Sequence, residues 1–344
     1  MDKTQVRTDV LVIGAGPVGL FVVFEAGLLG LRTHVIDNLN RIGGQCIEIY
    51  PRKPIYDIPG LPEVMAGELI QRLMTQIKPF QPGFTLGERA EELKKTEEKT
   101  YQIITEQGTL HEAPVVVIAG GLGSFEPRKP PIPNIQHYEN KGVDYAIKDP
   151  EKYRKKQVII AGGGDSALDW TLELMNYTQH LSLIHRGESF RAAPDSVQRL
   201  RTCVAEGRVK LYTHTEATDI AGTEHVERIQ LKTQGKDILW KETDYYIPLF
   251  GLKPKLGPLA NWGIEIEKNA LRVNNAKDYQ TNLPGVYAVG DISTYPGKLK
   301  LILCGFHEAA VAMQYAYQHI HPDKKFVMKY TTVNGIQGFE SPQP

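Results

Sequence analysis

The feature that most constrains the fold of this chain is a glycine-rich turn that joins an apolar strand to a helical segment. The apolar residues Val10 to Ile13 run directly into the motif GAGPVG of residues 14–19, and a helical pattern follows from Leu20 to Leu29. In such turns the first glycine permits the tight turn, the second lets a pyrophosphate approach the backbone, and the third lets the helix pack closely. The positive end of the helix then faces the phosphates.

The segment after this helix supplies an acidic residue. Thr33 to Ile36 is a predicted strand that ends at Asp37, whose carboxylate is placed to accept hydrogen bonds from a ribose 2′-hydroxyl. A glycine turn alone could be an ordinary loop. Here strand, turn, helix, strand and acid follow one another with the spacing of a nucleotide-binding βαβ unit, and this order predicts a Rossmann-type domain.

The same arrangement occurs again near the middle of the chain. Gln157 to Ala161 is a predicted strand, the motif GGGDSA occupies residues 162–167, and Leu168 to Met175 opens a helix. Alanine takes the place of the third glycine, which the pattern tolerates. A second dinucleotide fold is therefore predicted.

The residue that ends the next strand differs between the two folds. His185 stands where the first fold has Asp37, 23 residues after the first glycine of the turn in each case, and Arg186 and Arg191 follow it. Cations at the place where an NAD site has a carboxylate suit a 2′-phosphate, which arginine can bind bidentately. This favours NADPH over NADH, with a solvated basic loop as the alternative.

Length and motif order predict two domains, one inserted into the other. A chain of 344 residues is too long for one core of ordinary size. Apolar strands at 115–119 and 245–250 mark the expected crossings, and 285–291 is predicted as a strand ending in a Gly-Asp turn before a helix at about 305–317. The predicted ranges are 1–125 and 248–325 for the first domain and 126–247 for the second.

Composition argues against several classes of function. Forty basic and forty acidic residues give a formal net charge of zero, so no nucleic-acid partner is expected. The N-terminus lacks the apolar segment of a secretion signal and no apolar run could span a bilayer, which predicts a cytoplasmic protein without a membrane partner. Cys46, Cys203 and Cys304 are too far apart for a Cys-x-x-Cys pair, and the ten histidines form no metal-binding set, so no metal is expected.

Together these motifs resemble those of the pyridine-nucleotide flavoprotein reductases of thioredoxin-reductase type. Five motifs occur in the family's order, at similar intervals, over nearly the whole chain. They are GAGPVG at 14–19, GGQ at 43–45, GGGDSA at 162–167, the histidine and arginines of 185–191, and YAVGD at 287–291.

The redox disulfides of that family are missing. Thioredoxin reductases carry a C-A-x-C disulfide shortly before the second glycine turn, where residues 142–149 contain no cysteine. Glutathione-reductase relatives carry theirs after the first fold, where residues 43–51 retain only Cys46. Because thiol–disulfide exchange needs a dithiol to hold two electrons, electrons are expected to pass directly from flavin to an acceptor.

Among relatives that lack both disulfides, the sequence most resembles the thioredoxin-reductase-like ferredoxin–NADP reductases. The likeness is carried by residues 51–60, 121–128, 164–170 and 295–300. It implies an α/β fold of two Rossmann-like three-layer domains, with the NADPH domain inserted into the FAD domain. It also implies that NADPH gives hydride to flavin N5 of non-covalent FAD, which releases electrons singly to an iron–sulfur protein, with no residue acting as general acid or base.

The resemblance and the motifs assign residues to both cofactors. The residues expected at FAD are Gly14, Gly16, Pro17, Val18, Gly19, Asp37, Gly44, Gln45, Tyr50, Ala90, Phe125, Gly290, Asp291 and Thr331. The residues expected at NADPH are Gly162, Gly164, Asp165, Ser166, Ala167, His185, Arg186 and Arg191. Asp37 departs from the family's commoner glutamate, which shortens the reach to the ribose and keeps the charge. Tyr50 is expected to stack on one flavin face and Tyr330 on the other, although either tyrosine could instead be an ordinary loop residue.

The resemblance also implies partners. A C-terminal extension, here about residues 326–344, covers the flavin of the other subunit in this family, which implies a homodimer. The electron partner is expected to be ferredoxin or flavodoxin, and an acidic ferredoxin requires a basic docking patch. Its candidates are Arg52, Lys53, Arg128, Lys129, Lys298 and Lys300. Two alternatives stay open: an NADPH oxidase or quinone reductase on the same scaffold, and a flavin-bearing redox sensor without significant turnover.

Overall fold

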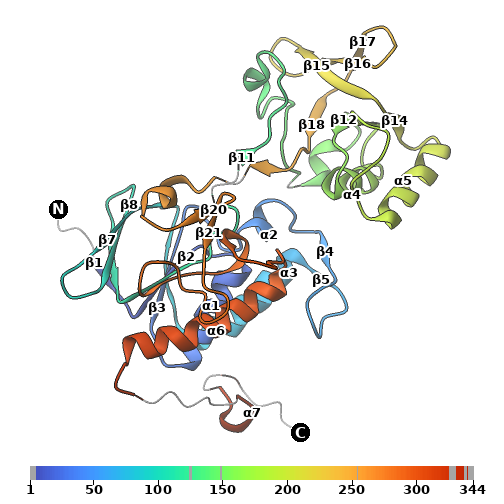
Figure 1. Ribbon diagram of the computed structural model, residues 1–344. Helices are drawn as coiled ribbons and strands as arrows, with labels where there is room; N and C mark the ends of the chain where they lie inside the picture. Colours follow the sequence, from blue (N-terminus) through green and yellow to red (C-terminus); the bar gives the residue numbers. More distant parts are fainter. Residues whose placement is uncertain are drawn as a thin grey trace. The chain divides into compact units, whose positions relative to one another are not determined.

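The computed structural model describes residues 5–123, 126–147, 149–253, 255–324, 331–336 and 339. The chain divides into two units, coloured by sequence in Figure 1. The first unit combines Met1–Ser124 with Pro254–Pro344, and the second is Phe125–Lys253. The second unit thus continues beyond residue 247, where the sequence placed its end, because its last strand pairs with its first: β19 (Leu252–Lys253) lies antiparallel to β11 (Glu126–Pro127).

A parallel sheet of five strands forms the centre of the first unit. In spatial order its strands are β22 (Val286–Ala288), β10 (Val115–Ile118), β2 (Val10–Ile13), β3 (Thr33–Asp37) and β6 (Gly83–Leu86). Strand β10 is buried throughout, as expected for a parallel strand covered on both faces.

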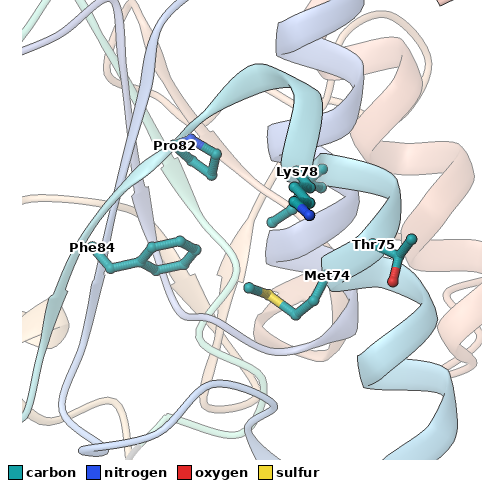
Figure 2. A pocket seen from close by; sticks show the side chains of 6 residues that line it. Met74, Thr75, Lys78, Pro82 and Phe84 are labelled. Atoms are coloured by element: carbon teal, nitrogen blue, oxygen red, sulfur yellow. The ribbon is translucent and has the colours of Figure 1, made fainter. Parts of the chain in front are cut away.

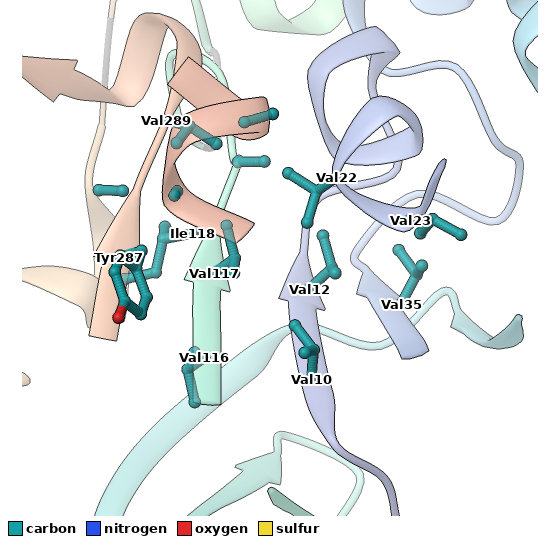
Figure 3. Close-up of a cluster of buried hydrophobic side chains, with 14 of the residues drawn as sticks. Val10, Val12, Val22, Val23, Val35, Val116, Val117, Ile118, Tyr287 and Val289 are labelled. Atoms are coloured by element: carbon teal, nitrogen blue, oxygen red, sulfur yellow. The ribbon is translucent and has the colours of Figure 1, made fainter. Parts of the chain in front are cut away.

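Three helices form a packed layer, and two of them contact this sheet. They are α1 (Pro17–Leu28), which packs on β2 and β3, α6 (Ile302–Ile320), which packs on α1 and β10, and α3 (Ala66–Ile77), which packs on α1. Figure 3 shows the interface between α1 and the sheet, with Val22 next to Val12 and Val23 next to Val35. These four side chains are fully buried, so the helix is held by apolar contact along its length.

Smaller elements complete the first unit. A mixed sheet has the order β1 (Gln5–Arg7), β9 (Leu110–Ala113), β8 (Tyr101–Thr105) and β7 (Ala90–Lys95). The other short strands are β4 (Pro54–Ile55), β5 (Val64–Met65), β20 (Ile266–Glu267), β21 (Ala270–Arg272) and β23 (Ser293–Thr294). The short helices are α2 (Gln45–Glu48), η1 (Lys78–Phe80), η4 (Gly257–Asn261), η5 (Gly290–Ile292) and α7 (Thr331–Asn334).

The second unit has its own parallel sheet. The strand order is β14 (Lys210–Tyr212), β13 (His180–Ile184), β12 (Gln157–Ala161) and β18 (Tyr245–Pro248), with helices α4 (Asp165–Leu174) and α5 (Pro194–Ala205). An antiparallel sheet follows, of β15 (Thr215–Ala221), β16 (Arg228–Thr233) and β17 (Leu239–Glu242). The 3-10 helices are η2 (Ile135–Tyr138) and η3 (Pro150–Tyr153). The predicted α/β class, with two parallel dinucleotide-type sheets, is confirmed.

Helix ends differ from the predicted ones for local reasons. Helix α1 begins at Pro17 rather than Leu20, because Gly16 is the extended N-cap residue and proline is well suited to the first helical position, where no backbone donor is needed. Helix α6 spans 19 residues, longer at both ends than the predicted 305–317.

None of the helices described here is both long and apolar enough to cross a bilayer. Within the described ranges, no three His, Cys, Asp or Glu side chains are grouped to bind a metal ion.

Candidate dinucleotide sites

The first glycine turn lies where the order of the sheet reverses. The chain adds β3 and β6 on one side of β2, and later β10 and β22 on the other, so the carboxyl ends of β2 and β10 form the switch point at which open α/β sheets bind ligands. Gly14 has a φ of +111°, and its N–H donates to the carbonyl oxygen of Ile36 at 2.8 Å. A Cβ on Gly14 would lie 2.5 Å from the carbonyl oxygen of Ala119. The turn is therefore pressed against the end of β10, and only glycine fits.

The other two glycines of this turn differ in what surrounds them. A Cβ on Gly19 would lie 1.9 Å from the carbonyl oxygen of Gly14, so this glycine sets how closely α1 approaches the turn. A Cβ on Gly16 would meet no protein atom within 4 Å. The space over Gly16 is therefore open to a ligand, beside the N-terminus of a helix of 12 residues.

The GGQ motif reaches this open space. Gly44 has a φ of +53°, and a Cβ on it would lie 3.1 Å from the Cα of Gly16, so the two backbones adjoin. The side-chain amide of Gln45 lies close to Gly121, where an added Cβ would be 3.1 Å from Nε2. Three loops that are distant in sequence thus meet over the switch point.

Asp37 closes the turn from the end of β3. Its Oδ2 accepts from the Ala15 N–H at 2.6 Å, and its Oδ1 accepts from the Leu39 N–H at 2.8 Å. The side chain is buried, and burial raises its pKa in spite of these two hydrogen bonds. Each carboxylate oxygen has a second lone pair, so Asp37 can hold the turn and still accept from a ribose hydroxyl.

Asp291 lies on the other side of the switch point, in η5. The side chain of Val18 packs against the preceding Gly290, where an added Cβ would lie 3.4 Å from Cγ2. Burial raises the pKa of Asp291, while the charges of Lys300 and Lys298 act in the opposite direction. Within the described part of the chain, the carboxylate of Asp291 accepts no hydrogen bond. A half-buried carboxylate without a donor fits a ligand that carries hydroxyl groups, as the ribityl chain of FAD does.

Tyr50 and Cys46 lie near Asp291, whose negative charge contributes to raising the pKa of both. The Cys46 thiol donates to the Tyr50 hydroxyl at a sulfur–oxygen distance of 3.9 Å. Burial is the main cause of both shifts, and it raises the pKa of Cys46 to about 11. Cys46 is therefore a protonated thiol at neutral pH, which is the unreactive form.

The remaining residues expected at FAD stay predictions. Ala90 is buried at the start of β7. Thr331 is exposed at the start of α7. Phe125 and Tyr330 lie outside the described residues.

The second glycine turn repeats this geometry. Strand β12 lies between β13 on one side and β18 on the other, which makes the ends of β12 and β18 the switch point. A Cβ on Gly162 would lie 2.8 Å from the carbonyl oxygen of Leu249, the counterpart of the approach between Gly14 and Ala119. It would also lie 2.6 Å from the Cβ of Ala167, which is fully buried.

His185 occupies the position that corresponds to Asp37. The last residue pair between β2 and β3 is Ile13 with Ile36, and the last pair between β12 and β13 is Ala161 with Ile184. Asp37 and His185 each come one step after that pair. The imidazole lies over Gly163, where an added Cβ would be 2.1 Å from Cε1. The equal interval in sequence therefore reflects an equal register in the structure.

The loop after His185 is anchored by its backbone. The Arg191 N–H donates to the Gly163 carbonyl at 2.7 Å, and the Ala193 N–H donates to Asp165 Oδ1 at 2.9 Å. Asp165 thus fastens the loop. The side chains of Arg186 and Arg191 are exposed, and neither has an acidic partner among the residues described. Both guanidinium groups remain available to a phosphate.

An apolar pocket in the first unit is separate from these turns. Figure 2 shows its lining side chains, at the end of α3 and the start of β6: Met74, Thr75, Ile77, Lys78, Pro82 and Phe84. Because β6 is parallel to β2, the start of β6 lies at the edge of the sheet opposite to the glycine turn. None of the predicted cofactor residues lines the pocket.

Comparison with known proteins agrees with this geometry. A family model described as pyridine nucleotide-disulphide oxidoreductase matches residues 68–290. Ferredoxin–NADP reductase 1 of Christiangramia forsetii is 61% identical over 340 residues, which cover 98% of this chain and 96% of that protein. The ferredoxin–NADP reductase of Flavobacterium johnsoniae is 59% identical over 336 residues, with the same two coverages. This chain belongs to the thioredoxin-reductase-like ferredoxin–NADP reductase family.

A solved structure supports the fold of this ferredoxin–NADP reductase family member. The thioredoxin reductase of Lactococcus lactis superposes with a TM-score of 0.77 at 23% sequence identity, over 91% of this chain and 99% of that one. At this identity the likeness concerns the fold. The predicted family and fold are confirmed.

One residue predicted for docking was assigned wrongly. The side chain of Lys298 is only 6% exposed, and its ammonium group pairs with Glu308, which is fully buried. A lysine held in this way cannot present its charge to a protein partner. Lys129 also pairs, with Glu139 at 2.6 Å.

Glu308 is a residue that sequence reasoning missed. It lies on α6 and accepts from the backbone N–H of Gly290 at 2.7 Å, at the turn that carries Asp291. A signal was present in the sequence, since Glu308 is the one acidic residue in the 19 residues of this otherwise largely apolar helix. A lone carboxylate in such a helix needs a buried partner, but sequence alone does not identify it.

Proposed function

We propose that this chain is a ferredoxin–NADP reductase that transfers electrons between NADPH and ferredoxin through non-covalent FAD. The observation that carries the proposal is a pair of glycine turns at two switch points in two units. One is closed by the carboxylate of Asp37 and the other is followed by a basic loop. The relatives of high identity that bear this enzyme name match along nearly the full chain, which supports ferredoxin as the electron partner.

The first unit is proposed as the FAD domain. Gly16 leaves room for the pyrophosphate at the N-terminus of α1, Asp37 accepts from the adenosine ribose, and Asp291 accepts from the ribityl hydroxyls. Tyr50, half-buried near Asp291, shapes access to the flavin ring. When bound, FAD supplies a ring that accepts hydride and passes on single electrons.

The second unit is proposed as the NADPH domain. Its glycine turn receives the pyrophosphate at the N-terminus of α4, while Arg186 and Arg191 bind the 2′-phosphate. The backbone bond from Arg191 to Gly163 places this loop beside the turn before a ligand arrives. Preorganisation of this kind reduces the entropy lost on binding.

Direct electron transfer from flavin to the partner protein follows from the cysteines. Cys46 and Cys203 are buried and Cys304 is partly exposed, and all three are free thiols. Without a dithiol the chain cannot store two electrons on sulfur. Free thiols are also typical of proteins in a reducing compartment, which supports a cytoplasmic location.

The docking patch for ferredoxin is proposed at Arg52 and Lys300. Both are exposed, and neither has an ion-pair partner in the described part of the chain.

We also propose a homodimer in which residues 326–344 cover the flavin of the second copy. The exposure of Thr331 in a single chain is compatible with this arrangement, and sedimentation that finds only monomers would refute it.

The decisive experiment is anaerobic reduction of the purified protein by NADPH or NADH, followed by ferredoxin with cytochrome c as reporter. The proposal predicts faster bleaching of the flavin by NADPH and rapid electron delivery to cytochrome c that depends on ferredoxin. Rapid bleaching with delivery only to oxygen or quinone would indicate an oxidase or quinone reductase. Bleaching without turnover on any acceptor would indicate a redox sensor, and a colourless protein that takes up no flavin would refute the cofactor assignment.

A further inference from the structure

The turn that carries Asp291 is fastened to α6 by a buried charged pair. Glu308 Oε2 accepts from the Gly290 N–H at 2.7 Å. Glu308 Oε1 accepts from the Tyr295 hydroxyl at 2.6 Å and from the ammonium group of Lys298. The Ser293 hydroxyl closes the turn by donating to the Gly290 carbonyl at 2.9 Å. Three donors from three parts of one loop thus converge on a single carboxylate.

The same segment of α6 touches the first glycine turn. A Cβ on Gly305 would lie 2.4 Å from Cγ2 of Val18 and 3.3 Å from the Cα of Gly290. Gly305 lies three residues before Glu308 and therefore on the same face of the helix. Gly290 is consequently enclosed between Val18, which follows the pyrophosphate turn, and Glu308.

We propose that Glu308 and Lys298 are positioning residues for FAD: their buried pair holds the Gly290 turn so that the Asp291 carboxylate faces the cofactor. The inference rests on the proposed assignment of FAD to the first unit. Gly290 has a φ of +74°, and its N–H is held by a charged acceptor that is fully buried, where a charge-assisted bond is strong. Glu308 is fully buried and both of its oxygens accept from the loop, so its effect passes through the turn.

Lys298 is needed because Glu308 is fully buried. An isolated carboxylate at such a site would take up a proton or draw in water, and either change weakens its hold on Gly290. The ammonium group also lies over the ring of Tyr295, 5.2 Å from its centroid, which keeps the loop from 295 to 298 in register with the turn.

Lys298 and Lys300 form a matched pair for the test. Both are lysines whose charge acts on Asp291, but only Lys298 is buried against Glu308. In fluorescence titrations of the apoprotein with FAD, Lys298→Met should raise the dissociation constant about tenfold or more, the usual effect of breaking a buried charge-assisted bond. Lys300→Met should stay within about twofold of the unaltered protein, since the three donors on Glu308 described above do not include Lys300 and the Gly290 turn is left in place. Equal weakening by both variants would overturn the inference, because a general loss of positive charge would explain it.

A second pair of variants covers the case in which Lys298→Met does not fold. Lys298→Met with Glu308→Gln keeps an oxygen acceptor for the Gly290 N–H, whereas Lys298→Met with Glu308→Met removes it at similar volume. Both double variants remove both buried charges and leave neither one unpaired, so both apoproteins are expected to fold. The Gln variant should bind FAD about tenfold or more tightly than the Met variant, and its flavin absorption spectrum should match that of the unaltered protein. Equal FAD affinity in the two would show that the pair only stabilises the fold, and an unaltered protein without FAD affinity would refute the proposed function instead.

Discussion

Replacement of Arg191 by alanine should weaken binding of NADPH and leave NADH unaffected. The loop is held by the Arg191 backbone N–H, 2.7 Å from the Gly163 carbonyl, and by the Ala193 N–H on Asp165, so removal of the side chain leaves the loop in place. A charge-assisted bond from arginine to phosphate contributes about 1.5–3 kcal/mol, and exposure of the side chain places the value near the lower end. A loss of about 1.5 kcal/mol corresponds to roughly tenfold in kcat/KM for NADPH.

The assay is steady-state reduction of ferricyanide, a small acceptor that avoids the docking of ferredoxin. Arg191→Ala and Arg186→Ala are each measured with NADPH and with NADH, at low and high ionic strength. NADH lacks the 2′-phosphate, so its kcat/KM should change by less than about twofold. Arg201→Ala, an exposed cation on α5 of the same unit, is the control and should change neither cofactor. Equal losses with NADPH and NADH, or no loss with either arginine variant, would refute the assignment of this loop to the 2′-phosphate.

Three further predictions concern the first unit. Gly16→Ala should weaken FAD binding but leave the melting temperature of the apoprotein nearly unchanged, because its Cβ enters open space beside α1. Gly19→Ala should also lower the melting temperature by several degrees, because its Cβ would lie 1.9 Å from a carbonyl oxygen, and similar melting temperatures of the two variants in calorimetry would contradict this contrast. Iodoacetamide should modify the partly exposed Cys304 well before the buried Cys46, whose pKa is raised to about 11. Preferential labelling of Cys46 in a peptide map would contradict this, because it would show that the Cys46 thiolate is accessible. The free energy of unfolding should fall as the pH drops from about 6.5 towards 4, because burial lowers the pKa of His34 to about 4 and the unfolded chain therefore binds more protons than the folded one in this range. Urea titrations of His34→Gln should show a smaller decline of the free energy of unfolding over the same range.

The elements that were predicted best are those whose signal is local. Strands β2, β3, β12 and β13 are short apolar runs next to glycine turns, and the chain offers them no other stable arrangement. The small antiparallel sheets were not predicted, because strands such as β17 are largely exposed and their pairing depends on partners elsewhere in the unit. Helix α6 was predicted too short at its start, since its N-cap residue is Leu301, which makes no side-chain capping bond and gives no start signal in the sequence.

The candidate site also combines features that the local sequence predicted with contacts that depend on the tertiary structure. The interval of 23 residues that separates Asp37 from Gly14, and His185 from Gly162, was visible in the sequence because a βαβ unit of fixed geometry needs a fixed length of chain. Asp165 was predicted at the cofactor, and the structure adds that its carboxylate accepts from the Ala193 N–H and so holds the basic loop, which the sequence did not reveal. A carboxylate can accept from any donor within reach, and which donor that is depends on where the loop returns.

The amino-acid sequence alone predicts two glycine turns of the dinucleotide-binding type, an acid after one and cations after the other, and no dithiol between them. These are properties of residue type and spacing over a few dozen residues, which backbone sterics translate directly into structure. The folded structure was needed to show that Lys298 is buried on Glu308, that this pair holds the turn beside Asp291, and that Arg186 and Arg191 stay exposed. Segments far apart in the chain decide whether a charged side chain is exposed to water or buried against another charge. Burial changes the free energy of a charged group far more than the choice of one charged residue type over another.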